Sequence, residues 1–143
     1  NFKIISEIVK AKIPVMGHIG YTPQFKKKFK IEGKKPNEIN KLVKEAKSIE
    51  QAGAFSIVLE CITSNTSKKI TNHLKIPTIG IGSSSNCDGQ ILVTDDMLGM
   101  SGFYPKFVKK YANLSLIIKK AVKNYSKDVK NKTFPNKKNF LNE

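Results

Sequence analysis

Residues 54–61, with the sequence AFSIVLEC, form a short apolar run that ends beside a carboxylate, and this run decides the fold. Its length and β-branched content predict a strand, and Gly53 separates it from the polar segment before it. Helical patterns occur on both sides, over residues 37–52 and 64–75. A buried strand between two helices is typical of an α/β protein whose neighbouring strands run parallel.

The two flanking helices each show one apolar face. In the helix predicted over 37–52, Asn37 serves as the N-cap and a glycine follows the last turn. Its apolar stripe consists of Ile39, Leu42, Val43, Ala46 and Ile49. In the helix predicted over 64–75, Ile70 and Leu74 point inward. Both helices can therefore pack on the same sheet.

The same alternation continues in both directions from the central run. The further predicted elements are a helix over 2–11, strands over 13–17, 76–82 and 89–96, and a helix over 112–130. Residues 21–36 are basic and rich in turn formers, which predicts a surface loop. Neither GxGxxG nor GxxxxGK[ST] occurs, which argues against a nucleotide-binding fold. The order fits an α/β fold of the (β/α) barrel or half-barrel type.

The composition narrows the class of protein. All 26 basic residues are lysines, and with 11 acidic residues they give the 143-residue chain a formal net charge of +15. A hydrophobic content of 39% supports a packed core and argues against wholesale disorder. No apolar run approaches the ~18–20 residues of a membrane span, and two cysteines form no disulfide framework. We therefore expect a cytoplasmic protein without a membrane partner.

The positive charge leaves a basic nucleic-acid-binding module as an alternative, because clustered cations release counterions from phosphate. Three features argue against it. Arginine, which contacts guanine and phosphate through two hydrogen bonds, is absent, the lysines are scattered, and few aromatic residues lie among them. We expect a solvated basic face and no nucleic-acid partner.

Polar side chains stand at the end of each predicted strand. His18 follows the first strand, Glu60 lies near the end of the second, and residues 82–84 and 94–96 close the third and fourth. The carboxyl ends of parallel strands meet at one edge of a sheet, where α/β enzymes build their sites. This edge is therefore the candidate active site.

Glu60 and His18 are the principal candidates. Glu60 follows three apolar residues, so we expect it at a partly desolvated edge, where it suits a general base; the alternative is a rim carboxylate paired with a lysine. His18 lies between two glycines that allow close approach of backbone or ligand. It either donates a hydrogen bond to a substrate or is a packing histidine.

Three other groups receive structural interpretations. Asp95 and Asp96 carry oxygens that suit a divalent cation, but adjacent residues of a strand point to opposite faces, which favours one pairing and one capping residue. Cys61 has no histidine base nearby in the sequence, so a thiol nucleophile is disfavoured. His73 lies on a predicted helix and is expected to be structural or at the surface.

Four segments together resemble a known family. They are IPVMGHIGYTPQ (13–24), AGAFSIVLEC (52–61), IPTIGIGSSSNCDGQILVTDDMLGM (76–100) and YPKFVKKYA (104–112). In this order they resemble ketopantoate hydroxymethyltransferase (3-methyl-2-oxobutanoate hydroxymethyltransferase). The resemblance implies a (β/α)8 TIM barrel, of which residues 1–130 are the C-terminal half, followed by a Lys/Asn-rich, poorly ordered tail over 131–143. The absence of an initiating methionine agrees with a partial chain.

The resemblance also implies an activity. The family transfers a hydroxymethyl group from 5,10-methylenetetrahydrofolate to 3-methyl-2-oxobutanoate in pantothenate biosynthesis, with Mg²⁺ as cofactor and as a homo-oligomer. Glu60 matches the family's general base, which removes the proton at C3 of the oxoacid, and His18 is expected to bind substrate or line the folate pocket. The magnesium ligands are expected in the missing N-terminal half, so no metal ligand is assigned in this chain.

One segment departs from the family pattern. The loop over 25–35 is shorter and lacks the usual glycine-rich stretch, which puts closure over the active site in doubt. Two alternatives to an active transferase stay open: the chain is inert as supplied, or it belongs to a neighbouring barrel family that makes or breaks C–C bonds beside a metal-bound 2-oxoacid.

Overall fold

The computed structural model describes residues 2–24 and 30–140. The chain divides into two compact units, Asn1–Ile91 and Leu92–Glu143, and each is described by itself. The first unit contains a sheet with helices, and the second contains two helices joined by irregular segments.

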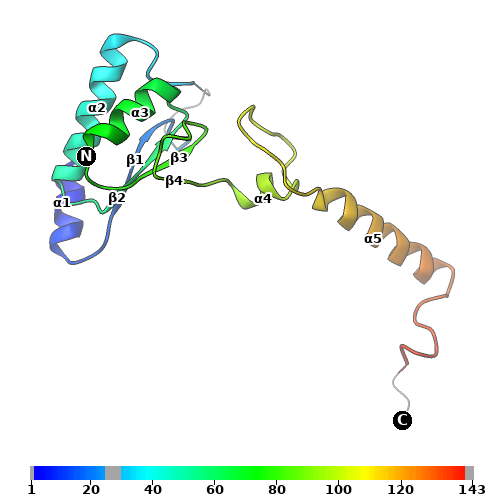
Figure 1. The fold of residues 1–143 in the computed structure, drawn as a ribbon. Helices are drawn as coiled ribbons and strands as arrows, with labels where there is room; N and C mark the ends of the chain where they lie inside the picture. The colour runs from blue at the N-terminus through cyan, green and yellow to red at the C-terminus, as the bar shows by residue number, and fades with distance from the viewer. Residues whose placement is uncertain (1, 25–29, 141–143) are drawn as a thin grey trace. The chain divides into compact units, whose positions relative to one another are not determined.

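The first unit is built on a parallel four-stranded sheet in the order β1-β2-β3-β4 (Figure 1). Its strands are β1 (Met16–Gly20), β2 (Ser56–Glu60), β3 (Thr78–Ile81) and β4 (Gly89–Gln90). The predicted parallel α/β sheet is confirmed. Strands β2 and β3 fall inside their predicted ranges, because both are β-branched runs buried at the centre of the sheet.

The first and fourth strands differ from their predictions. Residues 13–15 are not part of β1, which starts at Met16 and includes His18, so this histidine lies within a strand and not after one. The glycines of this segment look like turn residues, but here they allow close backbone packing. Strand β4 stops at Gln90, and Thr94–Met97 form the short helix α4 instead of continuing the strand.

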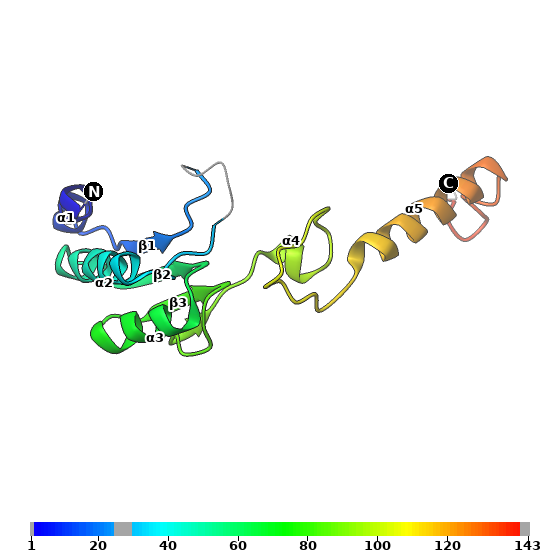
Figure 2. The same ribbon diagram turned by 90° about the horizontal axis from the view of Figure 1, so that it is seen from above.

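Three helices pack in a row along one face of the sheet (Figure 2). They are α1 (Phe2–Lys10), α2 (Pro36–Gln51) and α3 (Ser64–His73). Helix α2 begins with Pro36 after Lys35 as N-cap, so the predicted cap at Asn37 is wrong; the Asn37 side chain instead accepts a hydrogen bond from the amide of Glu38. Residues in the first turn of a helix donate no intrahelical hydrogen bond, so proline, which has no N–H, fits there. This explains why the helix begins at Pro36.

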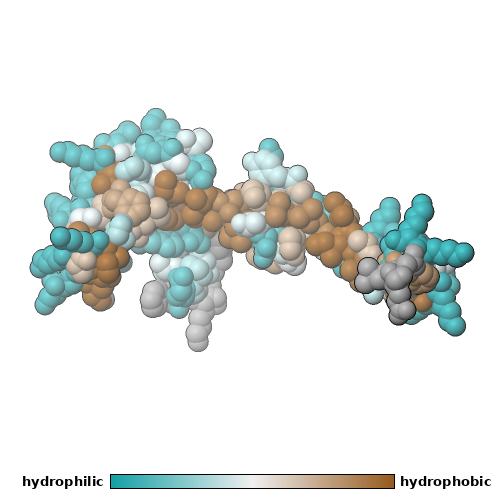
Figure 3. Space-filling model, turned by 90° about the horizontal axis from the view of Figure 1, so that it is seen from below, coloured by the Kyte–Doolittle hydropathy of each residue, from teal (hydrophilic) through white to brown (hydrophobic). Residues whose placement is uncertain are grey.

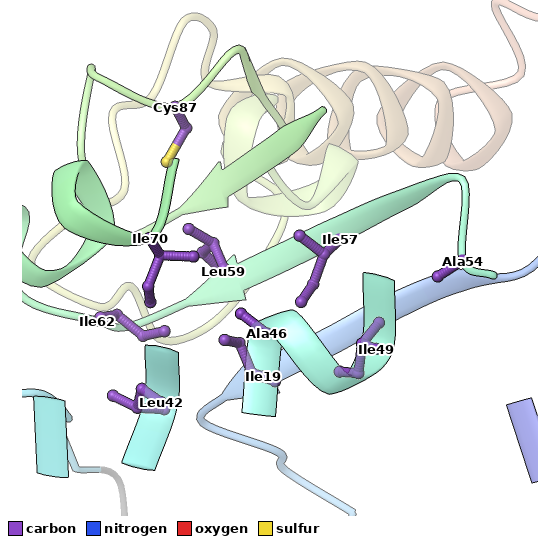
Figure 4. Close-up of a cluster of buried hydrophobic side chains, with 10 residues drawn as sticks. All are labelled: Ile19, Leu42, Ala46, Ile49, Ala54, Ile57, Leu59, Ile62, Ile70 and Cys87. Atoms are coloured by element: carbon purple, nitrogen blue, oxygen red, sulfur yellow. The ribbon is translucent and has the colours of Figure 1, made fainter. Parts of the chain in front are cut away.

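The core of the first unit lies between this helix row and the sheet (Figure 4). Ile57 and Leu59 of β2 are fully buried, and they meet Ala46 of α2 and Ile70 of α3, which are fully buried as well. The apolar stripe predicted for α2 and the inward position of Ile70 are thereby confirmed. The core packs against one face of the sheet. The opposite face does not take part in this packing.

The second unit contains α4 and the long helix α5 (Leu114–Lys130). No residue of α5 is buried, and its apolar side chains are exposed, as the brown surface in Figure 3 illustrates. These exposed residues are Leu116, Ile117, Ile118, Val122, Tyr125 and Val129. Over the described part of the chain, no helix is both long and apolar enough to cross a membrane.

Candidate active site

Glu60 is the last residue of β2, and the chain turns sharply directly after it. The turn is made by Cys61, whose φ of 53° lies in the left-handed region that residues other than glycine rarely adopt. Such a conformation costs free energy and persists where the surrounding structure holds it. The turn ends the strand at Glu60 and places its side chain at the carboxyl edge of the sheet, as predicted.

The side chain of His18 meets that of Glu60. The register of the sheet pairs Gly20 with Glu60 and His18 with Val58, so His18 and Glu60 lie diagonally on the same face of neighbouring strands. The His18 Nε2 atom lies 3.0 Å from Oε2 of Glu60. The two side chains are 34% and 18% exposed, so the pair is partly shielded from water but open to a ligand.

The backbone of Glu60 is held on the β1 side. Its carbonyl oxygen accepts a hydrogen bond of 2.9 Å from the amide of Tyr21. Gly20 has a φ of 97°, and a Cβ at this position would collide with the Glu60 carbonyl oxygen. Glycine at position 20 is therefore required for β1 to approach the carboxyl end of β2 this closely.

The backbone around Glu60 is also held on the β3 side, by Ser83. The Ser83 hydroxyl donates a hydrogen bond of 2.6 Å to the carbonyl of Leu59 and accepts one of 3.2 Å from the amide of Ile62. The amide of Cys61 donates to the carbonyl of Ile81 over 2.9 Å. One serine thus bridges the residues before and after the left-handed turn, and it helps to stabilise that turn.

Cys61 does not supply a nucleophile in this arrangement. The residue is 1% exposed, and burial, followed by the nearby charge of Glu60, raises the pKa of its thiol to about 11. The reactive form of a cysteine is the thiolate, which is scarce at neutral pH for such a group. The interpretation of Cys61 as a structural residue agrees with this environment.

An open groove of about 750 Å³ runs from His18 along β1 and between α1 and α2. Ile19 and Gly20 line it from the strand, and Leu42 and Ile49 line it from α2. Charged side chains from Lys30, Glu38 and other residues stand at its rim, where Lys30 and Glu38 form an ion pair of 3.0 Å. The hydrogen bond from Lys30 holds the pKa of the Glu38 carboxyl below its usual range.

The remaining predicted residues lie elsewhere. Asp95 and Asp96 stand in the first turn of α4, in the second unit, and the Asp96 carboxylate accepts a hydrogen bond from Ser101. The prediction that Asp95 and Asp96 lie on a strand and point to opposite faces is wrong, since both residues are helical. His73 is exposed on α3, with its Nδ1 atom 2.7 Å from the carbonyl of Lys69. Within residues 2–24 and 30–140, no three acidic, histidine or cysteine side chains gather as a metal-binding group.

The sequence did not reveal the roles of Gly20, Tyr21 and Ser83 around Glu60. The sequence indicated only that Ser83 is one of the polar residues that close the third predicted strand. Its contacts with Leu59 and Ile62 depend on the pairing of β2 with β3 and have no local pattern. Closure of the site by the loop over 25–35 stays a prediction, because residues 25–29 of that loop lie outside the described residues.

Comparison with known proteins assigns this arrangement to a family. The sequence model described as ketopantoate hydroxymethyltransferase matches residues 1–137, nearly the whole chain. The chain belongs to the ketopantoate hydroxymethyltransferase family. The family resemblance inferred from the four sequence segments is therefore confirmed.

Curated members of the family are similar over the same length. A 3-methyl-2-oxobutanoate hydroxymethyltransferase of Francisella tularensis subsp. novicida is 54% identical over 141 residues, which cover 96% of this chain and 53% of the relative. The enzyme of that name from Pseudothermotoga lettingae is 54% identical with the same coverage. That from Clostridioides difficile is 52% identical over 140 residues, 95% of this chain and 51% of the relative. The chain spans about half the length of the curated relatives it matches.

Proposed function

We propose that this chain is the base-carrying half of a 3-methyl-2-oxobutanoate hydroxymethyltransferase. The enzyme transfers a hydroxymethyl group from 5,10-methylenetetrahydrofolate to 3-methyl-2-oxobutanoate and forms 2-dehydropantoate for pantothenate biosynthesis. Membership of the family supports the reaction class. The observation that carries the site is the Glu60 carboxylate at the carboxyl end of β2, paired with His18 on the face opposite the helices.

In this proposal Glu60 is the general base. Its carboxylate takes the proton from C3 of the oxoacid, and the electron pair of that C–H bond forms the enolate. The enolate carbon then forms a bond to the one-carbon unit of the folate, and water supplies the hydroxyl group of the product. Both C–N bonds that held the one-carbon unit break, and the two nitrogens take up the C3 proton and one proton of the water as tetrahydrofolate leaves. The buried β2 strand and the turn at Cys61 hold the base in place during this step. The His18 side chain lies beside Glu60 on the same face of the sheet and is about one-third exposed.

We propose further that the four-stranded sheet is half of a (β/α)8 barrel. Three observations support this: the strands are parallel, the helices of the first unit cover one face, and the His18–Glu60 pair lies on the other face. In a barrel that other face points inward, and active sites form at the carboxyl ends of the strands. The groove beside β1 would then accept a further strand.

Cofactors and partners follow from the family as part of the proposal. Magnesium is part of the proposal on the family resemblance alone, which implies that its ligands lie in the N-terminal half of the enzyme, outside this chain. The folate donor, a homo-oligomeric state and a cytoplasmic location are proposed on the family resemblance alone. The 143 residues on their own are proposed to be inactive, since they correspond to about half of each relative.

The test is transfer by the full-length protein that contains this sequence. Purified protein with Mg²⁺ and 3-methyl-2-oxobutanoate should form 2-dehydropantoate from a ¹³C-labelled folate donor, detected by mass spectrometry. Glu60→Gln should lower turnover by about a thousandfold or more, because an amide cannot accept the proton. Glu7→Gln on α1 is the matched control, since Glu7 forms only an exposed ion pair with Lys10. Unchanged turnover in Glu60→Gln would remove Glu60 from the mechanism.

A further inference from the structure

The pairing of His18 with Glu60 has a consistent structural basis. Gly17, directly before His18, packs so closely on α2 that a Cβ there would collide with the Ile49 side chain. Gly20, two residues after His18, packs as closely on the carbonyl of Glu60. Both glycines let β1 pack closely against its neighbours. The position of the His18 backbone relative to Glu60 is therefore fixed.

A carboxylate at the end of a flexible side chain is a more effective base when a partner fixes its orientation. The terminal torsion of a glutamate is broad and roughly two-fold, so either oxygen can turn towards a substrate. A charge-assisted hydrogen bond to one oxygen fixes the orientation of the group and leaves the other oxygen with a defined direction. Misplacement of a base by small distances lowers the rate of proton removal.

We propose that His18 is a positioning residue for Glu60. The observation is the 3.0 Å distance between His18 Nε2 and Oε2 of Glu60. In the proposed role the Nε2–H group donates to Oε2, and Oε1 is then the atom that takes the C3 proton. The proposal rests on the proposed function, because it assumes that Glu60 is the base. It differs from a direct substrate-binding role, since the ring nitrogen involved is directed at the carboxylate and acts through it.

The surroundings of His18 distinguish this role from core packing. The side chain is about one-third exposed on the face opposite the helices, while the core of the first unit lies on the other face. The strand neighbour of His18 on that core face, Ile19, carries the packing and is 5% exposed. Removal of the imidazole should therefore leave the fold intact and affect the carboxylate it contacts.

The test measures two reactions of the full-length protein with a matched set of variants. One reaction is the exchange of the C3 proton of 3-methyl-2-oxobutanoate with D₂O, followed by ¹H NMR, and the other is complete transfer. His18→Gln places an amide N–H near the position of Nε2, His18→Asn places one near Nδ1, and His18→Leu offers none. His73→Gln changes the exposed histidine of α3 and serves as control.

The expected result is a change in kcat with little change in the KM for the oxoacid. His18→Leu and His18→Asn should both lower kcat for exchange by about 10- to 100-fold, the range for a lost hydrogen bond to a charged group. His18→Gln should recover most of the rate, and His73→Gln should have no effect. Should the leucine variant fail to fold, the comparison of glutamine with asparagine decides, because both are polar and differ in where the N–H lies.

Combination with Glu60→Gln separates the possible failures. If His18 acts through Glu60, the double variant should exchange no more slowly than Glu60→Gln alone. A raised KM with unchanged kcat in the His18 variants, or additive losses in the double variant, would overturn the positioning role while Glu60 stays the base. Full exchange by Glu60→Gln would instead refute the proposed function on which the role rests.

Discussion

The two units of this chain bury their apolar residues to very different degrees. In the unit Asn1–Ile91, β2 is buried by α2 and α3, and Ile57 and Leu59 are inaccessible to solvent. In the unit Leu92–Glu143, the 17-residue helix α5 has no buried residue, and Leu116 is 62% exposed. Both helices α2 and α5 are amphipathic, so the difference lies in what covers their apolar faces.

The determinants of the candidate site all lie in the unit that is well packed. The candidate base, its histidine partner and the serine that holds its backbone all belong to the unit with its own core. A packed core holds side chains in fixed rotamers, which a base requires and an uncovered helix cannot supply. The first unit is therefore expected to hold the site geometry, and the second unit to contribute little to its stability in this chain.

The largest effect on stability is expected from the core of the first unit. Leu59→Ala should lower the free energy of unfolding of the 143-residue chain by about 2–5 kcal/mol, because the substitution leaves a cavity beneath β2. Urea unfolding followed by circular dichroism measures it. A loss below about 1 kcal/mol would mean that β2 is not the centre of a packed core.

The bridge made by Ser83 should contribute less. Ser83→Ala removes the donor to the Leu59 carbonyl and the acceptor for the Ile62 amide, so we expect a loss of about 1–2 kcal/mol. Ser85→Ala, in the same loop but exposed, is the matched control and should be neutral. Equal effects of the two substitutions in urea unfolding would show that the bridge does not stabilise the turn.

A smaller effect that depends on pH is expected from Cys61. Burial raises the pKa of its thiol from 9.0 to about 11, so the folded state keeps the proton while the unfolded state loses it above pH 9. The resulting stability is present below pH 9 and is lost as the pH rises towards 11. Unfolding midpoints of the native chain and Cys61→Ala between pH 8 and 11 measure it, and parallel curves would contradict the prediction.

The smallest effect is expected in the second unit. Leu116→Ala on α5 should change the free energy of unfolding of the 143-residue chain by less than about 0.5 kcal/mol, although the same side chain is truncated as in Leu59→Ala. The pair therefore tests the comparison between the units directly. A loss from Leu116→Ala as large as that from Leu59→Ala would show that α5 is covered in solution.

Much of the fold could be predicted because it depends on local patterns. The run before Glu60 is apolar, β-branched and bounded by glycine, and these properties hold for a central strand in any context. The first strand was predicted too early in the sequence, because the glycines of β1 have low strand propensity. Pairing with β2 overrides that propensity. Strand β4 was extended too far because its apolar run continues beyond Gln90, where pairing with β3 ends.

The candidate site was predictable in part for a similar reason. Glu60 could be identified from its place at the end of a buried strand, which is a property of one segment. The contact of His18 with Glu60 and the bridge of Ser83 join three strands, so they become visible only when the register is known. The left-handed turn at Cys61 has no sequence signal, since glycine would be expected there.

Removal of the C3 proton of the oxoacid by Glu60 is the step on which the proposed function depends. Its most direct measurement is exchange of that proton with D₂O by the full-length protein in the absence of folate, because exchange requires the base and no one-carbon transfer. This role of Glu60 predicts rapid loss of the C3 proton signal with the native protein and almost none with Glu60→Gln. Exchange at the native rate in Glu60→Gln would contradict it.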